Sequence, residues 1–193
     1  MVKTLAYLGP EGTHTEQASI CHDDTATRIP CTSISAVAHA VVSERADEGV
    51  VPIENSLGGS VPDTLDLLIQ EPKLSIRNEL VLLIKHFLVV EKGTKSKDVK
   101  VIYSHPQALT QCRVFLSNHY PNAELIASMS TSAAVQEMLS LKGNSAAIST
   151  DRAAKIYGAE ILSREIEDSP NNMTRFVILA PSDHPPTGTD KTS

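Results

Sequence analysis

Residues 49–69 read GVVPIENSLGGSVPDTLDLLI. The apolar run 49–53 is typical of a buried strand, and a polar, glycine-rich connection follows it. The second proline then opens a predicted helix that turns Leu65, Leu68 and Ile69 inward. A buried strand connected to a helix is the repeating unit of an α/β fold, so this stretch decides the fold class.

The same alternation extends from this stretch in both directions. Before it, the pattern predicts strands over 4–8 and 28–31 and helices over 13–22 and 33–45. After it, the pattern predicts strands over 99–103, 124–127, 145–148, 159–162 and 175–179, and helices over 106–118, 130–141 and 151–157. We therefore predict mostly parallel sheets flanked by helices.

The long apolar stretch 74–90 predicts two lobes rather than one. It is nearly continuous strand, which is long enough to leave one sheet and enter another. We place lobe 1 at about 1–78 plus 171–180 and lobe 2 at about 79–170, with 175–179 returning to the first sheet. The end, 181–193, is rich in Pro, Thr and Asp and predicts a disordered tail.

Composition excludes several classes of function. The 193 residues carry a formal net charge of -6, which disfavours a nucleic-acid partner. No apolar run reaches the ~18 residues of a membrane span, and Gly9 and Pro10 interrupt any secretory signal. Three cysteines at scattered positions favour a reducing compartment, so we expect a cytoplasmic protein. The seven histidines show no metal-ligand spacing, and we expect neither a metal nor a cofactor.

The candidate site lies where strands end and helices begin. In open α/β sheets, ligands bind at the carboxyl ends of the strands, and helix N-termini favour anions. Hydroxyl and amide side chains gather at these junctions, which are 9–13, 54–60, 104–107, 128–132 and 149–151. They suit a small carboxylate ligand in a cleft between the lobes, although Ser and Thr at such positions are also ordinary N-caps.

Some junction residues favour function more than others. Glu54, Asn55 and Ser56 follow a buried strand directly, and the glycine pair after them allows close backbone approach. His105 is better interpreted as a hydrogen-bonded structural histidine than as a base, because no acidic residue is near it in sequence. Gln107 and Gln111 share one helix face, which surface polarity explains almost as well.

The segment Thr174-Arg175-Phe176 begins a predicted strand. An extended backbone puts the Thr174 hydroxyl and the Arg175 guanidinium on opposite faces. Arg175 on an otherwise apolar strand is either a salt-bridge residue or an anion clamp.

These junctions resemble those of the prephenate dehydratase catalytic domain. The matching motifs occur in order, as LGPEGT (8–13), VPIENSLGGSV (51–61), SHPQALTQC (104–112), STSAA (130–134), AAI (146–148) and NMTRF (172–176). The resemblance implies two α/β lobes of the type II periplasmic-binding-protein kind with the active site in the cleft. It also implies conversion of prephenate to phenylpyruvate, water and carbon dioxide in phenylalanine biosynthesis, by a homodimer or homotetramer.

Two departures from the family pattern are visible. His14 and Thr15 stand where the family commonly has Phe-Ser, beside the expected pocket. The family also usually appends a regulatory ACT domain, for which we expect no room after Ala180.

The resemblance identifies one key residue, and the chemistry of the implied reaction suggests roles for the others. Thr174 is the key residue of the family motif, and we expect it to donate a hydrogen bond to the leaving hydroxyl or to pass on a proton from Glu54. Arg175 is expected to clamp the pyruvyl carboxylate, and Phe176 to supply an apolar wall. The polar residues expected to act beside them are Asn55 in catalysis and Thr13, Ser56, Ser104, His105, Gln107 and Gln111 in substrate binding.

Two other functions remain open at this point. A prephenate decarboxylase on the same scaffold would lose carbon dioxide without expelling hydroxide. A domain of the same shape could also bind a small carboxylate without catalysis.

Overall fold

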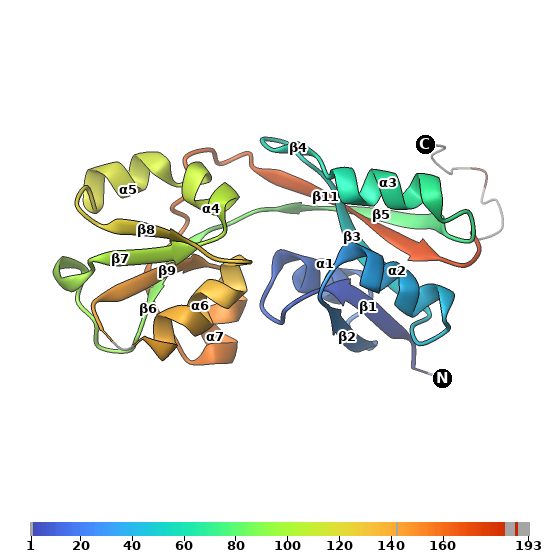
Figure 1. Cartoon of the computed structure of the whole chain (residues 1–193), viewed down its shortest axis with the longest axis horizontal. Coiled ribbons are helices and arrows are strands. Elements are labelled where there is room, and N and C mark those ends of the chain that lie inside the picture. Colours follow the sequence, from blue (N-terminus) through green and yellow to red (C-terminus); the bar gives the residue numbers. More distant parts are fainter. Residues whose placement is uncertain (1, 142, 184–187, 189–193) are drawn as a thin grey trace.

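The computed structural model describes residues 2–141, 143–183 and 188 and forms two α/β lobes side by side (Figure 1). Lobe 1 contains the sheet ordered β2 (Thr27–Cys31), β1 (Thr4–Leu8), β3 (Glu48–Asn55), β11 (Met173–Ala180) and β5 (Ser75–Leu83), with β4 (Gly59–Ser60) paired to β3. Its helices are α1 (His14–His22), α2 (Ile34–Val42) and α3 (Pro62–Gln70).

Lobe 2 is built on the second sheet. Its strands are ordered β10 (Glu160–Ser163), β6 (Phe87–Val90), β9 (Ser145–Ser149), β7 (Val101–Ser104) and β8 (Glu124–Ala127). Its helices are α4 (Pro106–Gln111), α5 (Arg113–His119), α6 (Thr131–Ser140) and α7 (Asp151–Tyr157), with a short 3₁₀ turn η1 (Ser96–Asp98).

The sheets are mixed, which corrects the prediction of mostly parallel sheets. In lobe 1, β1 pairs in parallel with β2 and β3, whereas β11 is antiparallel to both β3 and β5. In lobe 2, β7 pairs in parallel with β8 and β9, whereas β6 is antiparallel to β9 and β10. The strands nearest the two crossings between the lobes make the antiparallel pairs, because the chain enters and leaves each sheet through them.

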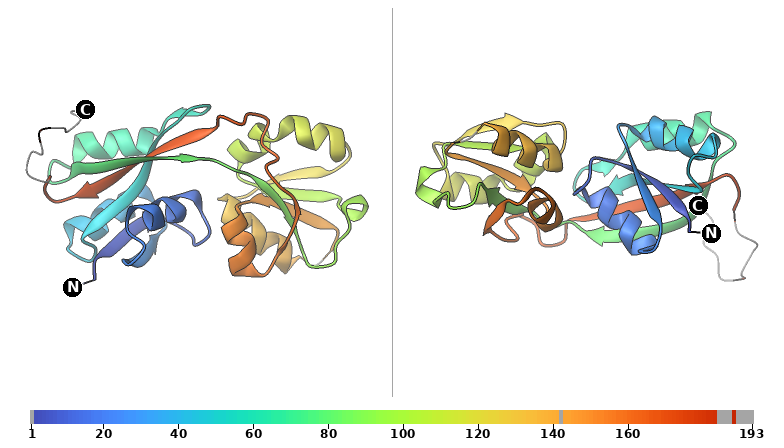
Figure 2. Two further views of the ribbon diagram at one scale, coloured as in Figure 1. Left: turned by 180° about the vertical axis from the view of Figure 1, so that it is seen from behind. Right: turned by 90° about the horizontal axis from the view of Figure 1, so that it is seen from below.

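The first crossing comes later than the boundary predicted near residue 79. β5 pairs with β11 along its whole length, from Ser75 opposite Ala180 to Leu83 opposite Met173, so it belongs to lobe 1. Ile84 N donates to Asn172 O at 2.7 Å, which holds the two crossing segments side by side (Figure 2). β11 pairs with β3 and β5, so residues 175–179 lie in the first sheet. The predicted disordered tail lies mostly outside the described residues.

Each sheet is buried on both faces by alternation along its strands. In β11, Val177 and Leu179 join the core beneath α2, whereas Phe176 and Ile178 join a separate core with Tyr7. Lobe 2 is organised in the same way. These buried faces fix which strand residues remain to face the cleft.

Two predicted helices differ in detail. The helix predicted over 106–118 is divided into α4 and α5, with Cys112 between them, and the Asp168 carboxylate accepts a hydrogen bond from Val114 N at 3.1 Å at the start of α5. In α3, Leu65 and Ile69 are exposed, at 39% and 81%, rather than inward. That helix packs through Leu67 and Leu68 instead.

None of the helices described within 2–141 and 143–183 is long and apolar enough to cross a bilayer.

Candidate active site

A cavity of about 910 Å³ lies between the lobes. Lobe 1 contributes the β1–α1 turn, the end of β3 and the start of β11, and lobe 2 contributes α4 and the start of α6. The polar and aromatic side chains in its wall include Thr13, His14, Asn55, His86, His105, Gln107, Gln111, Thr174 and Phe176. We call this cavity the cleft.

Asn55 and Thr174 lie opposite each other on paired strands, which brings them together in the cleft wall. They are cross-strand partners in β3 and β11, and both are buried, at 8% and 9% exposure. Asn55 Nδ2 donates to Thr174 Oγ1 at 2.9 Å. Because the Thr174 oxygen acts as the acceptor in this bond, the hydroxyl hydrogen remains to be donated.

The hydrogen bonds continue from Asn55 into lobe 2. The two hydrogens of Asn55 Nδ2 are shared among three acceptors, which are Thr174 Oγ1, Asn172 Oδ1 at 2.8 Å and Met173 O at 3.1 Å. Asn172 Nδ2 donates to Gln111 Oε1 at 3.0 Å. The same Gln111 oxygen lies 2.9 Å from His86 Nε2. We call Thr174, Asn55, Asn172, Gln111 and His86 the amide network.

Gln107 approaches the amide network from the start of α4. Its Nε2 donates to Asn55 Oδ1 at 3.3 Å and lies against Gly58. A side chain at Gly58 would occupy the place of the Gln107 amide, so the glycine permits this close approach.

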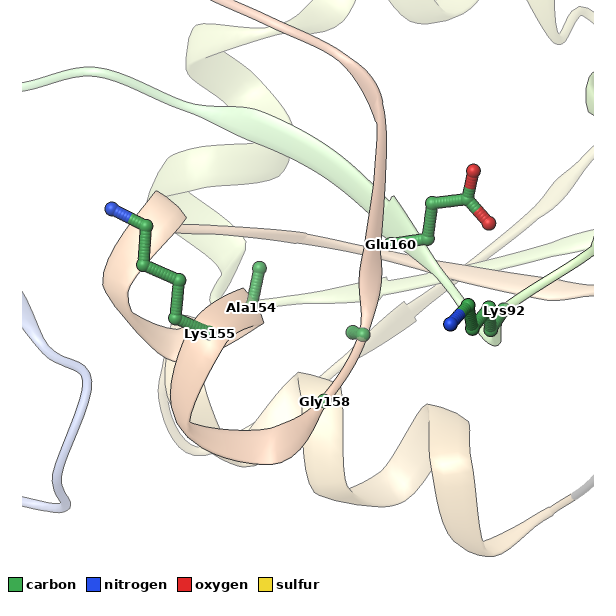
Figure 3. A pocket seen from close by; sticks show the side chains of 6 residues that line it. Lys92, Ala154, Lys155, Gly158 and Glu160 are labelled. Carbon is green, nitrogen blue, oxygen red and sulfur yellow. The ribbon is translucent and has the colours of Figure 1, made fainter.

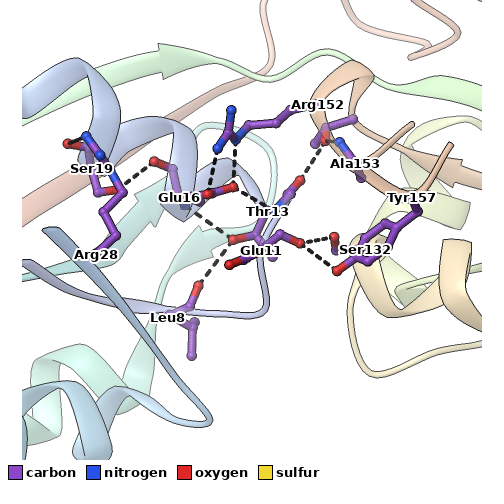
Figure 4. Close-up of polar contacts among 12 residues, drawn as sticks. Leu8, Glu11, Thr13, Glu16, Ser19, Arg28, Ser132, Arg152, Ala153 and Tyr157 are labelled. Carbon is purple, nitrogen blue, oxygen red and sulfur yellow. Dashed lines mark hydrogen bonds and ion pairs between the residues drawn. The ribbon is translucent and has the colours of Figure 1, made fainter. Parts of the chain in front are cut away.

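A second set of contacts joins the lobes beside the cleft, and we call it the strut (Figure 4). Ser132 Oγ and Tyr157 OH both donate to Glu11 O, the latter at 3.2 Å. Thr150 Oγ1, at the N-cap of α7, donates to Gly12 O at 2.6 Å. Gly12 has φ +85° and packs against Ala153, which leaves no space for a Cβ atom. The set is completed by Glu16 and Arg152.

Glu16 of lobe 1 and Arg152 of lobe 2 form the ion pair of the strut. Arg152 Nε and Nη2 bind the two Glu16 carboxylate oxygens at 2.7 and 2.8 Å, and Gly12 N donates to Glu16 Oε2 at 2.7 Å. Burial by itself would raise the pKa of Glu16, but the hydrogen bonds and charge of Arg152 and the Gly12 N–H lower it below its ordinary value. Glu16 therefore stays ionised at neutral pH.

Two histidines lie against each other in the cleft wall. The His14 and His86 rings pack edge to face, with centroids 5.8 Å apart. Burial lowers the pKa of His14 to about 3, with His86 acting in the same direction, and burial also lowers the pKa of His86. Both rings are neutral at pH 7. Within the part of the chain that the structure describes, neither ring nitrogen of His14 makes a hydrogen bond, nor does His86 Nδ1.

Two residues predicted for the chemistry, Glu54 and Arg175, do not lie in the cleft. They are cross-strand partners one position along from Asn55 and Thr174, so the alternation of β3 and β11 turns them to the other face of the sheet. There Arg175 Nη2 pairs with Glu54 Oε2 at 3.2 Å and Nη1 with Glu79 Oε2 at 3.4 Å. This geometry contradicts both the Glu54-to-Thr174 proton path and the Arg175 carboxylate clamp, and it matches the salt-bridge alternative for Arg175.

Ser56 and Ser104 also lie outside the cleft wall. Ser56 Oγ donates to Asn171 O at 3.3 Å and accepts from Met173 N at 2.9 Å, which fixes the loop before β11. Ser104 is fully buried and donates to Ile148 O at 2.8 Å. Both hydroxyls hold backbone segments together, so the structure does not bring them to the predicted ligand.

Three other predicted residues do line the cleft. Thr13 caps α1, with its oxygen accepting from Glu16 N and its hydrogen directed to Leu8 O. His105 caps α4 by accepting from Gln107 N at 3.3 Å, in line with the predicted structural histidine, and burial lowers its pKa. Phe176, at 1% exposure, is part of the apolar wall two positions after Thr174.

Sequence reasoning missed Asn172 and His86, and it noted His14 only as a departure from the family pattern beside the expected pocket. Asn172 and His86 lie in the two crossing segments, where neither strand nor helix periodicity applies. The available signals were the position of Asn172 two residues before Thr174 and the presence of His86 within an apolar run.

A smaller hollow of about 380 Å³ lies on the surface of lobe 2, with Lys92, Lys155 and Glu160 at its edge (Figure 3). These charged side chains are exposed, unlike the buried polar groups of the cleft. Across 2–141 and 143–183, no group of three or more His, Cys, Asp or Glu side chains is placed to hold a metal ion.

The fold and the cleft define a two-lobed α/β protein with a polar, donor-bearing site between its lobes. A family model described as prephenate dehydratase matches residues 5–184, and the chain belongs to that family.

Relatives and solved structures agree with this assignment. The chain is 44% identical over 190 residues to a bifunctional chorismate mutase/prephenate dehydratase of Stutzerimonas stutzeri, covering 98% of this chain and 52% of the relative. It therefore spans about half the length of that relative. Its structure is similar to that of the Arthrobacter aurescens prephenate dehydratase in complex with L-Phe, with a TM-score of 0.88, 35% identity and coverage of 98% and 63% of the two chains.

One structural neighbour carries a different description. GqqA, described as a novel type of quorum quenching acylase, matches with a TM-score of 0.84 and 29% identity over 96% of this chain and 66% of that chain. The reaction therefore has to be argued from the cleft and not from the fold.

Proposed function

We propose that this chain converts prephenate to phenylpyruvate, carbon dioxide and water. The reaction loses the ring carboxylate as carbon dioxide, and its bonding electrons pass through the ring to expel the hydroxyl at C4. A proton taken up from solvent converts the departing hydroxide to water, and the ring becomes aromatic. The hydroxyl is a poor leaving group, so a donor at its oxygen is the main requirement.

The single observation that carries the proposal is the hydrogen bond from Asn55 to Thr174. It occupies the Thr174 oxygen as an acceptor, so the hydroxyl acts as a donor. Thr174 lines the cleft, where its O–H can bind the departing oxygen. A threonine hydroxyl is too weak an acid to give up its proton outright, so Thr174 stabilises the developing charge by hydrogen bonding.

Other cleft residues support the same reaction. The apolar Phe176 disfavours a charged ring carboxylate and favours neutral carbon dioxide. With Arg175 on the other face of the sheet, the donors left for the pyruvyl carboxylate include the amides of Gln107 and Gln111 and the N-terminal N–H groups of α6, which lie in the cleft wall.

The test is turnover of prephenate by the purified chain, followed through phenylpyruvate absorbance. Thr174→Val should keep the fold and lower kcat about 10²–10³-fold, because it deletes one donor at the developing charge. Thr174→Ser should recover much of the loss. Thr27→Val makes the same change at an exposed strand position of the same sheet and should leave kcat unchanged.

The other outcomes identify the alternatives. Carbon dioxide release without phenylpyruvate would indicate the decarboxylase. Saturable binding of prephenate without turnover would indicate a binding domain. Near wild-type kcat in Thr174→Val would remove the hydroxyl from the mechanism.

We also propose that the protein acts in the cytoplasm as a homodimer or homotetramer. Its cysteines are free, which suits a reducing compartment. The edge strand β5 exposes Val81 and Leu83, at 54% and 48%, and gives lobe 1 an apolar edge suited to self-association. Light scattering of the purified chain tests the assembly, and a monomer at micromolar concentration would contradict it.

A further inference from the structure

The direction of every hydrogen bond in the amide network follows from two backbone groups. Leu57 N and Gly58 N both point at one atom of the Asn55 amide, at 3.1 and 2.8 Å. A backbone N–H can only donate, so this atom is the Asn55 oxygen and the other is its nitrogen. Asn55 therefore has a single allowed orientation.

The orientation of the Asn55 amide determines the orientation of the Asn172 amide. The Asn55 nitrogen can only donate, so the Asn172 atom 2.8 Å away is an oxygen. The Asn172 nitrogen then donates to Gln111 at 3.0 Å, so the Gln111 atom is also an oxygen. His86 Nε2, 2.9 Å from that same oxygen, must carry the ring hydrogen.

The network therefore ends in two donors that face the cleft. On the lobe 1 side, the Thr174 oxygen accepts from Asn55, so its hydroxyl donates. On the lobe 2 side, the Gln111 oxygen is taken by Asn172 and His86, so its NH₂ group is the polar group left for the cleft that Gln111 lines. The lobe 1 donor is fixed by Leu57 N and Gly58 N through Asn55, whereas the orientation of the Gln111 amide depends on Asn172, which is fully buried and stands between Asn55 and Gln111.

We propose that Asn172 is a positioning residue that carries the polarity of the amide network, meaning which atoms donate and which accept, from Asn55 to Gln111, so that lobe 2 presents a hydrogen-bond donor to an anionic ligand beside the Thr174 hydroxyl of lobe 1. Asn172 does not itself line the cleft, and it acts through Asn55 and Gln111. The ligand's identity as prephenate rests on the proposed function, whereas the polarity of the network does not.

Asn172→Asp tests the proposal because it changes one atom of the network. The new carboxylate still accepts from Asn55 but presents an oxygen to Gln111, so the Gln111 amide has to reverse. The Gln111 NH₂ group then faces this carboxylate and His86, the Gln111 oxygen faces the cleft, and the His86 hydrogen moves to Nδ1. The variant therefore removes the cleft donor of lobe 2 without removing Gln111.

The first measurement is the His86 tautomer, from long-range ¹H–¹⁵N NMR correlations of the unligated full chain at pH 7.5. We expect Nε2–H in the wild type and Nδ1–H in Asn172→Asp. Gln111→Glu keeps an oxygen toward both Asn172 and His86, so it should leave His86 as Nε2–H. A wild type with Nδ1–H would overturn the proposal, whatever the protein's activity.

The second measurement is the affinity for prephenate, as KM or, without turnover, as Kd. Loss of one donor to an anion should raise it about tenfold to a hundredfold in both Asn172→Asp and Gln111→Glu. The double variant should add little to either single one, because both remove the same donor. Asn171→Asp is the matched control, since it adds the same charge at the neighbouring, exposed position.

The outcomes separate this proposal from the proposed function. If Asn172→Asp affects affinity no more than Asn171→Asp does and leaves His86 as Nε2–H, Asn172 does not set the polarity. If Asn172→Asp fails to fold, the wild-type tautomer and the Gln111→Glu variant still decide the question. If the wild type does not turn over prephenate but His86 switches as expected, the proposed function fails and the positioning role stands.

Discussion

The strut and the amide network join the same two lobes with polar groups, but they differ in where their hydrogen bonds end. In the strut, the donors of Ser132, Thr150 and Tyr157 all end on backbone carbonyls, and Arg152 ends on a carboxylate. In the amide network, Thr174 and Gln111 each keep a hydrogen to donate in the cleft. A polar contact between the lobes therefore does not by itself distinguish a functional cluster from a structural one. The amide network differs from the strut because it keeps hydrogen-bond donors that no other group among the described residues uses.

The largest expected effect comes from a substitution at Gly12, which breaks the strut. Gly12→Ala places a Cβ 2.5 Å from Ser132 Oγ and 2.8 Å from the Ala153 Cα, at φ +85°. Crowding and left-handed backbone strain together should lower the free energy of unfolding by about 2–5 kcal/mol, measured by urea denaturation. Gly158→Ala is the control, because Gly158 has φ +70° with nothing within 4 Å. Equal losses in the two variants would show that the strut contact is not what Gly12 provides.

The next largest effect concerns His14, which packs on His86 and lies two residues after Gly12 of the strut. Its pKa falls from 6.5 in the unfolded chain to about 3 in the fold. Below pH 6.5 the unfolded chain binds the proton and the folded one does not, so stability is lost by about 1.4 kcal/mol per pH unit, or roughly 2 kcal/mol at pH 5.

His14→Phe should remove this loss and should also stabilise the fold at pH 7, because it deletes two ring nitrogens without partners among the described residues. Urea denaturation at pH 7 and pH 5 measures both effects. The same loss between pH 7 and pH 5 in the variant and the wild type would show that His14 is not buried in neutral form.

A smaller effect is expected from the ion pair of the strut. Arg152→Met should destabilise the fold by about 1–2 kcal/mol at pH 7, less than for a fully buried pair because the Arg152 side chain is 41% exposed. The pKa of Glu16 is lower in the fold than its ordinary 4.5, so the contribution is present above that value and is lost as pH falls through the folded pKa. The variant should therefore differ less from wild type at pH 3 than at pH 7.

Lys155→Met is the control for that prediction. Lys155 and Asp151 form an exposed pair, with side-chain exposures of 76% and 40%, and such pairs contribute about 0.5 kcal/mol or less. An Arg152→Met effect no larger than this would place the strut pair among ordinary surface pairs.

The smallest effect on stability is expected at Gly58, beside the amide network. Gly58→Ala displaces the flexible Gln107 amide, so the free energy of unfolding should change by less than about 1 kcal/mol. Because Gln107 moves away from Asn55, kcat/KM for prephenate should fall severalfold. Gly93→Ala, at a position outside the cleft lining with nothing within 4 Å, should leave kcat/KM unchanged. The comparison predicts that damage to the strut appears in stability and damage to the network appears in activity.

The sequence predicted the order of elements well because the junctions carry their own local signals. Thr13, Ser33, Ser130 and Thr150 each cap the helix that follows them. The predicted lobe boundary lies too early in the chain because the polar residues 77–79 resemble the end of a strand. They belong to an edge strand, where one side of the strand is free to carry polar residues.

The cleft was predicted less completely because its geometry depends on distant pairs. Thr174 meets Asn55 across 119 positions, and Asn172 meets Gln111 across 61. No local pattern encodes these pairs. Glu54 is adjacent to Asn55 in sequence, which suggested a shared role in the chemistry. Adjacent residues of a strand lie on opposite faces, however, so the two side chains are separated.

The central place of β11 in the first sheet has a consequence for how the chain is made. β11 lies between β3 and β5, so a nascent chain that ends before Met173 holds lobe 1 as two unjoined pieces, β2-β1-β3 and β5. Lobe 2 is one continuous stretch and has all its strands by Ser163. We therefore expect the lobe that is synthesised first to fold last, with two bare strand edges exposed while the ribosome completes the chain.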